Sequence, residues 1–216
     1  AGKTQNPNVP DCETITGGFG GIQGLSSYIK TRGFDIVIDA THPFATQIAN
    51  NAYTSSKRTS TAYIKLCRKP WESDIINWTS AINPEDAVRK LAKMGNRVFL
   101  TTGIHALQHF LLLENKWFLI RLIESSSSLP SLQNFEVLLD RGPFEQFEEL
   151  ELLKRNRIDT IVSKNSGGTF PAKLEASHKL GIPILMIQQP EPPRGALLYS
   201  LEETIDWLNN RFNINW

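Results

Sequence analysis

Short apolar runs alternate along the chain with longer segments in which apolar residues recur at helical spacing. Runs rich in Ile, Val, Leu and Phe, bounded by Gly, Pro or Asp, predict buried strands. They cover residues 34–40, 97–101, 117–121, 135–139, 158–162 and 182–187. Because strands that alternate with helices are typical of parallel sheets with crossover helices, the pattern predicts an α/β fold.

The expected helices are bounded by residues with known capping preferences. Asn83 and Ser200 precede helical patterns and are typical N-cap residues. Gly33 and Gly181 follow apolar periodic segments, where glycine commonly ends a helix in the left-handed conformation. Four helices are therefore predicted from their ends as well as from their periodicity.

The predicted elements divide into two α/β units with parallel sheets and a ligand cleft between them. We place the boundary near Gly95 and Asn96, so that residues 1–95 form the first unit and residues 96–216 the second. The last helix, over residues 200–211, is expected to pack back on the first unit. The opening residues resemble the exit of a strand, so we expect the first strand of this unit to precede Ala1.

Composition and charge narrow the possible partners. With 23 basic and 22 acidic residues the net charge is +1, which favours neither a nucleic acid nor a membrane as partner. Cys12 and Cys67 are too few for a disulfide scaffold or a metal cage, and we expect free thiols in a reducing compartment. The apolar runs are too short to cross a bilayer, so a cytoplasmic protein is expected. No spacing typical of metal ligands occurs, so no metal site is expected.

In open parallel sheets, ligands bind beyond the carboxyl ends of the strands, so the loops there are the candidate sites. The first such candidate is a cluster of glycines. Gly17, Gly18, Gly20 and Gly21 would let the backbone approach a ligand closely, and the following helix would point its N-terminus at a phosphate. A flexible turn without a ligand is the alternative for these glycines taken alone.

The second candidate is the segment over residues 39–45, which leaves the clearest strand and is expected to enter a helix at Pro43. His42 in this segment can donate a proton or bind a cofactor amide. A histidine that merely caps the helix is an equally good interpretation of the segment by itself.

The later loops carry hydroxyls, amides and cations. The loop at residues 163–168, with a lysine, an asparagine, serines and two glycines, suits an anion best. A strand-to-helix turn at residues 101–103 and a Gly-Pro turn after Arg141 are weaker candidates. Basic residues recur near the strand ends: Arg68, Arg121, Arg141, Lys164 and Lys173. Each of them alone would be an ordinary surface charge. Together they indicate a site for a multiply negative ligand.

Six short motifs occur in a fixed order: GGFGG at residues 17–21, DATHPFA at 39–45, RKPW at 68–71, LTTG at 100–103, RGPF at 141–144 and KNSGG at 164–168. In this combination the chain resembles the precorrin-6A reductase family. The resemblance implies two Rossmann-like domains, NADPH or NADH in the cleft, and reduction of one double bond of precorrin-6A or its cobalt form in cobalamin biosynthesis. It also implies a Gly-rich turn after the strand expected before Ala1.

The resemblance assigns roles to individual residues. Expected near the cofactor are Lys3, Thr4, Gly17, Gly18, Phe19, Gly20, Gly21, Asp39, Ala40, Thr41, His42, Pro43 and Phe44. Expected near the substrate are Arg68, Thr101, Thr102, Gly103, Arg121, Arg141, Lys164, Asn165, Ser166, Gly167, Gly168 and Lys173. Hydride addition also needs a proton, for which His42, Lys164 and water are the candidates.

Two other functions remain open at this point. One is a two-domain module that binds an anionic metabolite without turning it over. The other is a different nucleotide-dependent oxidoreductase, such as one acting on sugar nucleotides, for which a Tyr-x-x-x-Lys pair is expected. Tyr53 and Lys57 have that spacing, but they lie in a Ser/Thr-rich stretch that we interpret as a helix end.

Overall fold

A computed structural model describes residues 11–72, 75–110, 112–124 and 134–214. The chain divides into two compact units, the first from Ala1–Lys69 with Pro190–Trp216 and the second from Pro70–Gln189. Each unit has its own parallel sheet. Within the described residues, no helix is long and apolar enough to cross a membrane.

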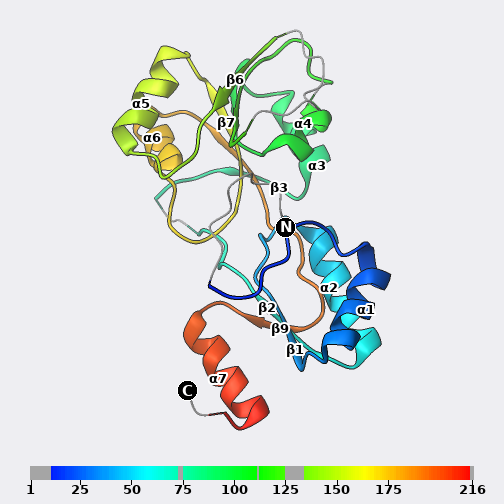
Figure 1. Cartoon of the computed structure of the whole chain (residues 1–216). Helices are drawn as coiled ribbons and strands as arrows, with labels where there is room; N and C mark the ends of the chain where they lie inside the picture. The colour runs from blue at the N-terminus through cyan, green and yellow to red at the C-terminus, as the bar shows by residue number, and fades with distance from the viewer. Residues whose placement is uncertain (1–10, 73–74, 111, 125–133, 215–216) are drawn as a thin grey trace. The chain divides into compact units, whose positions relative to one another are not determined.

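The first unit is built on a three-stranded parallel sheet in the order β1-β2-β9. Its strands are β1 (Ile36–Asp39), β2 (Ala62–Leu66) and β9 (Ala196–Leu198). Helices α1 (Gly21–Arg32) and α2 (Thr46–Thr59) lie together on one side of this sheet, and α7 (Leu201–Phe212) lies on the other (Figure 1). Because α1 leads directly into β1 and runs antiparallel to it, the N-terminus of α1 lies at the carboxyl edge of the sheet.

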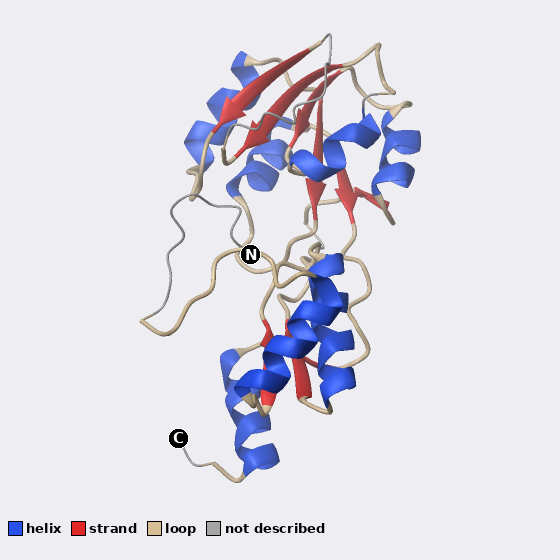
Figure 2. Ribbon diagram, turned by 45° about the vertical axis from the view of Figure 1, so that its right-hand side comes forward, coloured by secondary structure: helices blue, strands red, loops and turns tan. Residues whose placement is uncertain are grey.

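The second unit has a six-stranded parallel sheet in the order β3-β8-β7-β4-β5-β6. Its strands are β3 (Thr79–Ala81), β4 (Arg97–Leu100), β5 (Trp117–Leu122), β6 (Phe135–Leu139), β7 (Thr160–Lys164) and β8 (Ile184–Ile187). Its helices are α3 (Pro84–Leu91), α4 (Ile104–Phe110), α5 (Gln146–Arg155) and α6 (Ala172–Leu180). Helices α5 and α6 cover one face and α3 and α4 the other (Figures 1 and 2).

The order of the second sheet reverses between β4 and β7. From β4 the chain proceeds outward through β5 and β6, and it then returns to add β7 and β8 on the opposite side of β4. The carboxyl ends of β4 and β7 are therefore neighbours, and the N–H of Thr101 donates to the carbonyl oxygen of Val162 at 3.0 Å. Loops that diverge at such a point leave room for a ligand above the sheet.

The predicted α/β fold with parallel sheets and crossover helices is confirmed, and so are the four helix ends predicted from capping residues. The side chains of Asn83 and Ser200 each accept a hydrogen bond from the backbone N–H three residues later, at 2.8 and 3.0 Å. Gly33 and Gly181 have φ of 64° and 65°, the left-handed conformation that glycine adopts without strain.

The sequence analysis did not predict three of the strands, β2, β3 and β9. Two of them have three residues each, and β2 carries a lysine in its interior. Their pairing also changes the division of the chain. Because β3 pairs with β8, residues 70–95 join the second unit, and the boundary expected near Gly95 falls inside that unit, before β4. Residues 190–216 join the first unit through the pairing of β9 with β2.

The helix expected to start at Pro43 begins at Thr46 instead. The intervening residues form a turn in which the N–H of Ala45 donates to the carbonyl oxygen of His42 at 2.8 Å. Ala45 is the N-cap and offers no side-chain hydrogen bond. The polar side chains that precede the helix therefore do not cap it and form other hydrogen bonds.

Candidate functional site

The glycine cluster in the first unit forms an open loop at the N-terminus of α1. Gly17, Gly20 and Gly21 have φ of 111°, 76° and 73°, conformations that residues with a Cβ rarely adopt. A Cβ placed on any of these three, or on Gly18, would meet no atom within 4 Å. The first turn of α1 has no acidic residue. An open backbone loop at an uncompensated helix N-terminus suits an anionic group such as a phosphate.

A further glycine, Gly24, holds this loop against the helix. A Cβ at Gly24 would overlap the carbonyl oxygen of Phe19, so only glycine permits the loop to fold back on the first turn. The Phe19 ring packs on Tyr28 with centroids 5.1 Å apart, which anchors the loop from its other side. Sequence reasoning missed Gly24, although a glycine inside a helical pattern is a recognised sign of close packing.

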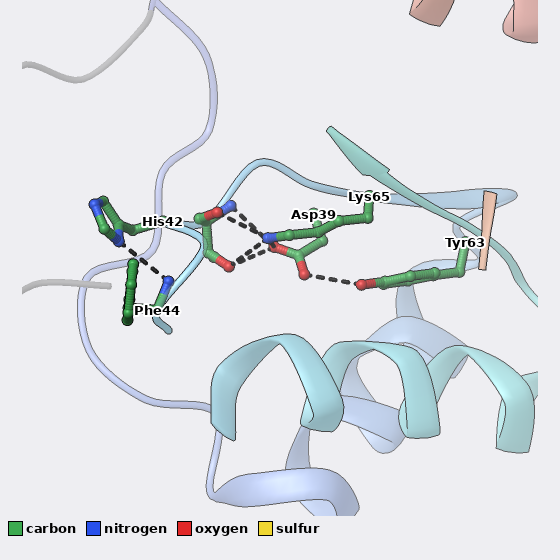
Figure 3. Close-up of polar contacts among 6 residues, drawn as sticks. Asp39, His42, Phe44, Tyr63 and Lys65 are labelled. Carbon is green, nitrogen blue, oxygen red and sulfur yellow. Dashed lines mark hydrogen bonds and ion pairs between the residues drawn. The ribbon is translucent and has the colours of Figure 1, made fainter. Parts of the chain in front are cut away.

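The loop after β1 is organised by a buried network of four residues (Figure 3). Oδ1 of Asp39 accepts hydrogen bonds from the Thr41 N–H at 2.9 Å, the Thr41 hydroxyl at 2.6 Å and Lys65 Nζ at 3.0 Å. Oδ2 accepts from the Tyr63 hydroxyl at 2.9 Å. Lys65 Nζ also donates to the carbonyl and hydroxyl oxygens of Thr41, at 2.8 and 3.0 Å. All three lysine donors and both carboxylate oxygens are thus satisfied.

The charges in this network are stabilised by hydrogen bonds rather than by water. Burial by itself raises the pKa of Asp39, but hydrogen bonds from Thr41, Lys65 and Tyr63 outweigh it, and the pKa lies below its ordinary value. Burial and the bond to Asp39 raise the pKa of Tyr63. Asp39 therefore stays ionised and Tyr63 stays protonated at neutral pH.

His42 lies at the exposed tip of the loop that this network holds (Figure 3). Its Nδ1 accepts a hydrogen bond from the Phe44 N–H at 3.2 Å, and the two rings lie 5.8 Å apart. Because Nδ1 acts as the acceptor, the neutral imidazole carries its proton on Nε2. The geometry therefore fits a histidine that presents an N–H donor beyond the carboxyl end of β1.

The residues predicted from the DATHPFA motif thus fall into two groups. The side chains of Asp39 and Thr41 shape the loop from within, whereas His42 is exposed at its tip. Sequence reasoning missed Tyr63 and Lys65, whose β2 register places Lys65 directly beside Asp39. The available signal was a charged residue inside an apolar run. A small pocket beside the network is lined by Pro43, Thr46, Ala49, Asn50, Lys65, Cys67, Pro190, Glu191, Pro192 and Pro193.

In the second unit, two of the predicted loops meet at the point where the sheet order reverses. After β4, the Thr101 hydroxyl donates to the carbonyl oxygen of Val162 at 3.1 Å, and Gly103 has φ of 75°. Thr102 is 3% exposed, and its hydroxyl has no hydrogen-bond partner among the described residues. This turn accordingly leaves one buried hydroxyl free at the edge where ligands bind in such sheets.

The loop after β7 is fixed by Asn165, which is 1% exposed. Its Oδ1 accepts from the Trp71 N–H at 2.7 Å, and its Nδ2 donates to the Trp71 carbonyl oxygen at 3.0 Å. The Trp71 indole N–H donates to the carbonyl oxygen of Gly168 at 2.9 Å. Trp71 of the RKPW motif and the KNSGG loop are therefore one structural assembly, in which Asn165 holds the backbone.

The remaining residues of that loop differ in their surroundings. Lys164 is partly buried, and burial lowers the pKa of its ammonium group. The Ser166 hydroxyl donates to the Lys164 carbonyl oxygen at 3.4 Å. Gly167 and Gly168 have φ of 66° and 84°, so the turn requires both glycines. Lys164 is the residue of this loop that can supply either a charge or a proton.

Arg121 and Glu149 form a buried ion pair in the same unit as these loops. Arg121, near the end of β5, donates from Nη1 to Oε1 of Glu149 in the first turn of α5 at 2.6 Å. The guanidinium lies 3.9 Å from the ring centroid of Phe144 and 4.8 Å from that of Phe99. The Phe of the RGPF motif thus orients Arg121, a contact that the sequence analysis did not foresee.

Lys173 occupies the first turn of α6 and is electrostatically coupled to this pair. Burial and the nearby charge of Arg121 lower the pKa of Lys173 to about 8, while Glu149 acts in the opposite direction. Arg121 and Lys173 therefore influence each other electrostatically at the carboxyl edge of the second sheet, and both were predicted to face a substrate.

Three other predicted positions contribute less. Arg141 is exposed, and its backbone N–H donates to Oδ1 of Asp140 at 2.9 Å. Arg68 is also exposed and belongs to the first unit, whereas the other residues expected at the substrate belong to the second. Lys3 and Thr4 lie outside the described residues. Tyr53 and Lys57 both lie within α2, where Tyr53 packs edge-on against Tyr63, 5.4 Å between centroids.

Comparison with known proteins agrees with this architecture. The sequence pattern of the family described as "Precorrin-6x reductase CbiJ/CobK" matches residues 1–209. A protein named precorrin-6A reductase from Rhodococcus erythropolis is 38% identical over 212 residues, covering 96% of this chain and 85% of the relative. One named cobalt-precorrin-6A reductase from Priestia megaterium is 28% identical, covering 88% of this chain and 78% of the relative.

A solved structure named CobK precorrin-6A reductase is similar in fold. It superposes with a TM-score of 0.85 at 34% identity, over 92% of this chain and 82% of the other. The chain belongs to the precorrin-6x reductase CbiJ/CobK family. Membership of a reductase family implies a reductant, in general a reduced nicotinamide.

Proposed function

We propose that this member of the precorrin-6x reductase family reduces one double bond of the precorrin-6A macrocycle, or of its cobalt form, with NADPH or NADH. The observation that carries the proposal is the gathering of three cations, Arg121, Lys164 and Lys173, at the carboxyl edge of the second sheet, where the strand order reverses. A macrocycle with many carboxylate side chains is the kind of ligand that such cations bind.

The first unit supplies residues that fit a dinucleotide. The open loop at Gly17, Gly18, Gly20 and Gly21 leaves room beside the uncompensated N-terminus of α1, where a diphosphate would accept backbone hydrogen bonds. His42, at the tip of the loop held by Lys65, would lie toward the nicotinamide. When bound, the reduced nicotinamide supplies the hydride.

The chain's own residues then have three tasks. The cations of the second unit bind and orient the substrate carboxylates, and the buried Asp39–Lys65 network keeps the His42 loop in one conformation. A proton must reach the carbon next to the one that accepts hydride. His42, through Nε2–H, and Lys164, through its ammonium group, are the two candidate donors.

The reaction is tested by mixing the chain with reduced nicotinamide and precorrin-6A and following nicotinamide oxidation. We expect oxidation that requires precorrin-6A and yields the dihydro product in equal amount. A module that only binds its ligand would give none, and this result would refute the proposal. A sugar nucleotide in place of precorrin-6A tests the other oxidoreductase class, and no oxidation is expected with it.

The proton donor is tested by two matched substitutions. His42→Asn keeps an acceptor for the Phe44 N–H but removes the imidazole that can release a proton. Lys164→Met keeps the approximate length of the side chain without its charge. Loss of a general acid typically lowers kcat by roughly 10² to 10⁴. The substitution that lowers kcat and abolishes one limb of its pH profile identifies the donor. If neither does, water delivers the proton.

A further inference from the structure

Two connections join the two units of the chain. The outgoing connection, residues 67–70, follows β2 of the first unit and leads into the second. The returning connection, residues 188–195, follows β8 of the second unit and leads to β9 of the first. In the second unit, the outgoing connection ends and the returning one begins beside the same residue, Asn165, in the loop after β7.

Asn165 forms hydrogen bonds at the ends of both connections. Its Oδ1 accepts from the Trp71 N–H at 2.7 Å, and its Nδ2 donates to the Trp71 carbonyl oxygen at 3.0 Å. Its backbone N–H donates to the carbonyl oxygen of Ile187, the last residue of β8, at 2.8 Å. Nδ2 also lies 3.5 Å from Oε1 of Gln188. Asn165 therefore ties the end of the outgoing connection to the start of the returning one.

The side chain of Asn165 is fully engaged in this tie. The residue is 1% exposed, and both N–H donors of its amide are directed at protein oxygens. An asparagine that binds a ligand keeps a donor or an acceptor open toward it. The contacts of Asn165 therefore indicate that it acts on the chain segments that it holds.

The outgoing connection is short between its fixed ends. In the first unit, the Cys67 N–H donates to the carbonyl oxygen of Leu198 at 2.8 Å, which continues the pairing of β2 with β9. Residues 68–70 separate this point from Trp71, and the last of them is a proline, which restricts the residue before it. A stretch this short reaches at most about 14 Å. While Asn165 holds Trp71, the connection allows little independent movement.

The returning connection is held at one end and stiff at the other. In the second unit, the N–H of Gln188 donates to the carbonyl oxygen of Ala81 in β3 at 2.8 Å. Three of residues 190–193 are prolines, whose rings fix the backbone angle φ. In the first unit, these residues line the small pocket to which Cys67 also contributes. Both connections therefore transmit the position of their ends.

We propose that Asn165 is a positioning residue: by tying Trp71 to the end of β8, it fixes where both connections leave the second unit and limits how far the two units move relative to each other. The inference rests on the proposed function, in which the first unit binds the nicotinamide and the second the macrocycle. Hydride transfer between ligands on different units depends on their alignment, and a displacement of about 1 Å can lower a rate roughly 10²-fold.

The first test measures the movement of the units without any ligand. Spin labels are attached to Lys30→Cys in α1 and Lys154→Cys in α5, two exposed positions, in a Cys12→Ser background where the remaining cysteine is buried. Pulsed electron paramagnetic resonance then gives the distribution of distances between the labels. We expect Asn165→Ala to broaden this distribution relative to the labelled protein with Asn165, because the outgoing connection is no longer held at Trp71.

A second variant and a matched control accompany this measurement. Asn165→Asp keeps an acceptor for the Trp71 N–H but does not donate to the Trp71 carbonyl oxygen, and it should also broaden the distribution. Asn156→Ala is the control. The Asn156 amide likewise donates to a backbone carbonyl oxygen, that of Leu152 at 2.9 Å, but at the end of α5. Its loss should leave the distribution as it is in the wild type.

The second test separates positioning from folding by means of the reaction. Asn165→Ala should lower kcat for precorrin-6A by about tenfold or more, because the reacting atoms are less well aligned. The dissociation constant of NADPH, which the proposed function places on the first unit, should not change. Asn156→Ala should keep the wild-type kcat. Thermal unfolding identifies any variant that is not folded at the assay temperature.

The outcomes distinguish this inference from the function on which it rests. An unchanged distance distribution in both Asn165 variants would overturn the inference, and so would equal broadening in Asn156→Ala. A broader distribution with wild-type kcat would leave the tie without a part in the reaction and would also overturn it. If the wild type does not reduce precorrin-6A although Asn165→Ala broadens the distribution, the proposed reaction is wrong and the restraint by Asn165 stands.

Discussion

Each unit of this protein contains a buried ion pair, and the two pairs differ in how completely they are satisfied. In the first unit, Lys65 uses all three donors and Asp39 both oxygens on partners within the loop and sheet. In the second unit, Arg121 and Glu149 share one short bond and each keeps a buried atom without a partner in the described residues.

The contrast indicates different purposes. A network in which every polar group is hydrogen-bonded stabilises one conformation. Its internal hydrogen bonds replace the bonds to water that the charges lose on burial. In an ion pair with unbonded buried atoms, each neutral polar group left without a hydrogen bond costs about 1–3 kcal/mol of stability, and each charged group costs more. Such a cost persists most readily where a ligand offsets it. The first pair therefore holds a loop, whereas the second fits the part in anion binding that we propose for Arg121.

The largest expected effect comes from breaking the closed pair. Lys65→Met removes the only cation bonded to Asp39 among the described residues and leaves a buried carboxylate. The free energy of unfolding should fall by about 3–5 kcal/mol, as for other broken buried pairs. Urea unfolding measures it, with Lys57→Met on the exposed side of α2 as a control that should change little. A loss below about 1 kcal/mol would mean that Asp39 is solvated or protonated in the variant.

Replacing both partners of the open pair should have the opposite sign. The double substitution Arg121→Met with Glu149→Leu exchanges two charges for apolar side chains and should raise the free energy of unfolding by about 1–4 kcal/mol. It should also abolish tight binding of precorrin-6A. Urea unfolding and fluorescence titration check the two effects. A double variant that is less stable than the wild type would assign Arg121 and Glu149 a structural role like that of Asp39 and Lys65.

A smaller effect is expected at the second oxygen of Asp39. Tyr63→Phe removes the hydroxyl that donates to Oδ2 and should lower the free energy of unfolding by about 1.5–3 kcal/mol, the range for a hydrogen bond to a charged group. Tyr53→Phe is the matched control, since Tyr53 contacts Tyr63 through its ring. Equal losses in the two variants would show that packing, rather than the hydrogen bond, is responsible.

The last expected effect is a dependence of stability on pH that appears only in acid. The folded-state pKa of Asp39 lies below its unfolded value of about 3.9, so this group stabilises the fold above that pH. The contribution is lost as the pH falls through the folded-state pKa. Urea unfolding between pH 5 and pH 3 should show a stability difference between wild type and Asp39→Asn that shrinks on acidification. A difference that stays constant with pH would show that Asp39 has equal pKa values in both states.

The sequence alone determined the fold class, several helix ends and the family. Apolar periodicity, N-caps such as Asn83 and glycines such as Gly33 are local signals, and each depends on a few neighbouring residues. The loops that carry polar groups at strand ends were also identified from order along the chain. The sequence therefore predicted which loops carry the chemistry before any contact was known.

Only the tertiary structure decided what each of those residues does. Asp39 and Lys65 are 26 positions apart, and their pairing depends on the register of two parallel strands. Arg121 meets Glu149 across 28 positions because a sheet and a helix pack together. Such long-range pairing has no period along the chain, and burial of a lysine in β2 even hides the strand from pattern analysis. Whether a charged residue holds a loop or can bind a ligand depends on which of its hydrogen-bonding groups lack a partner in the folded protein.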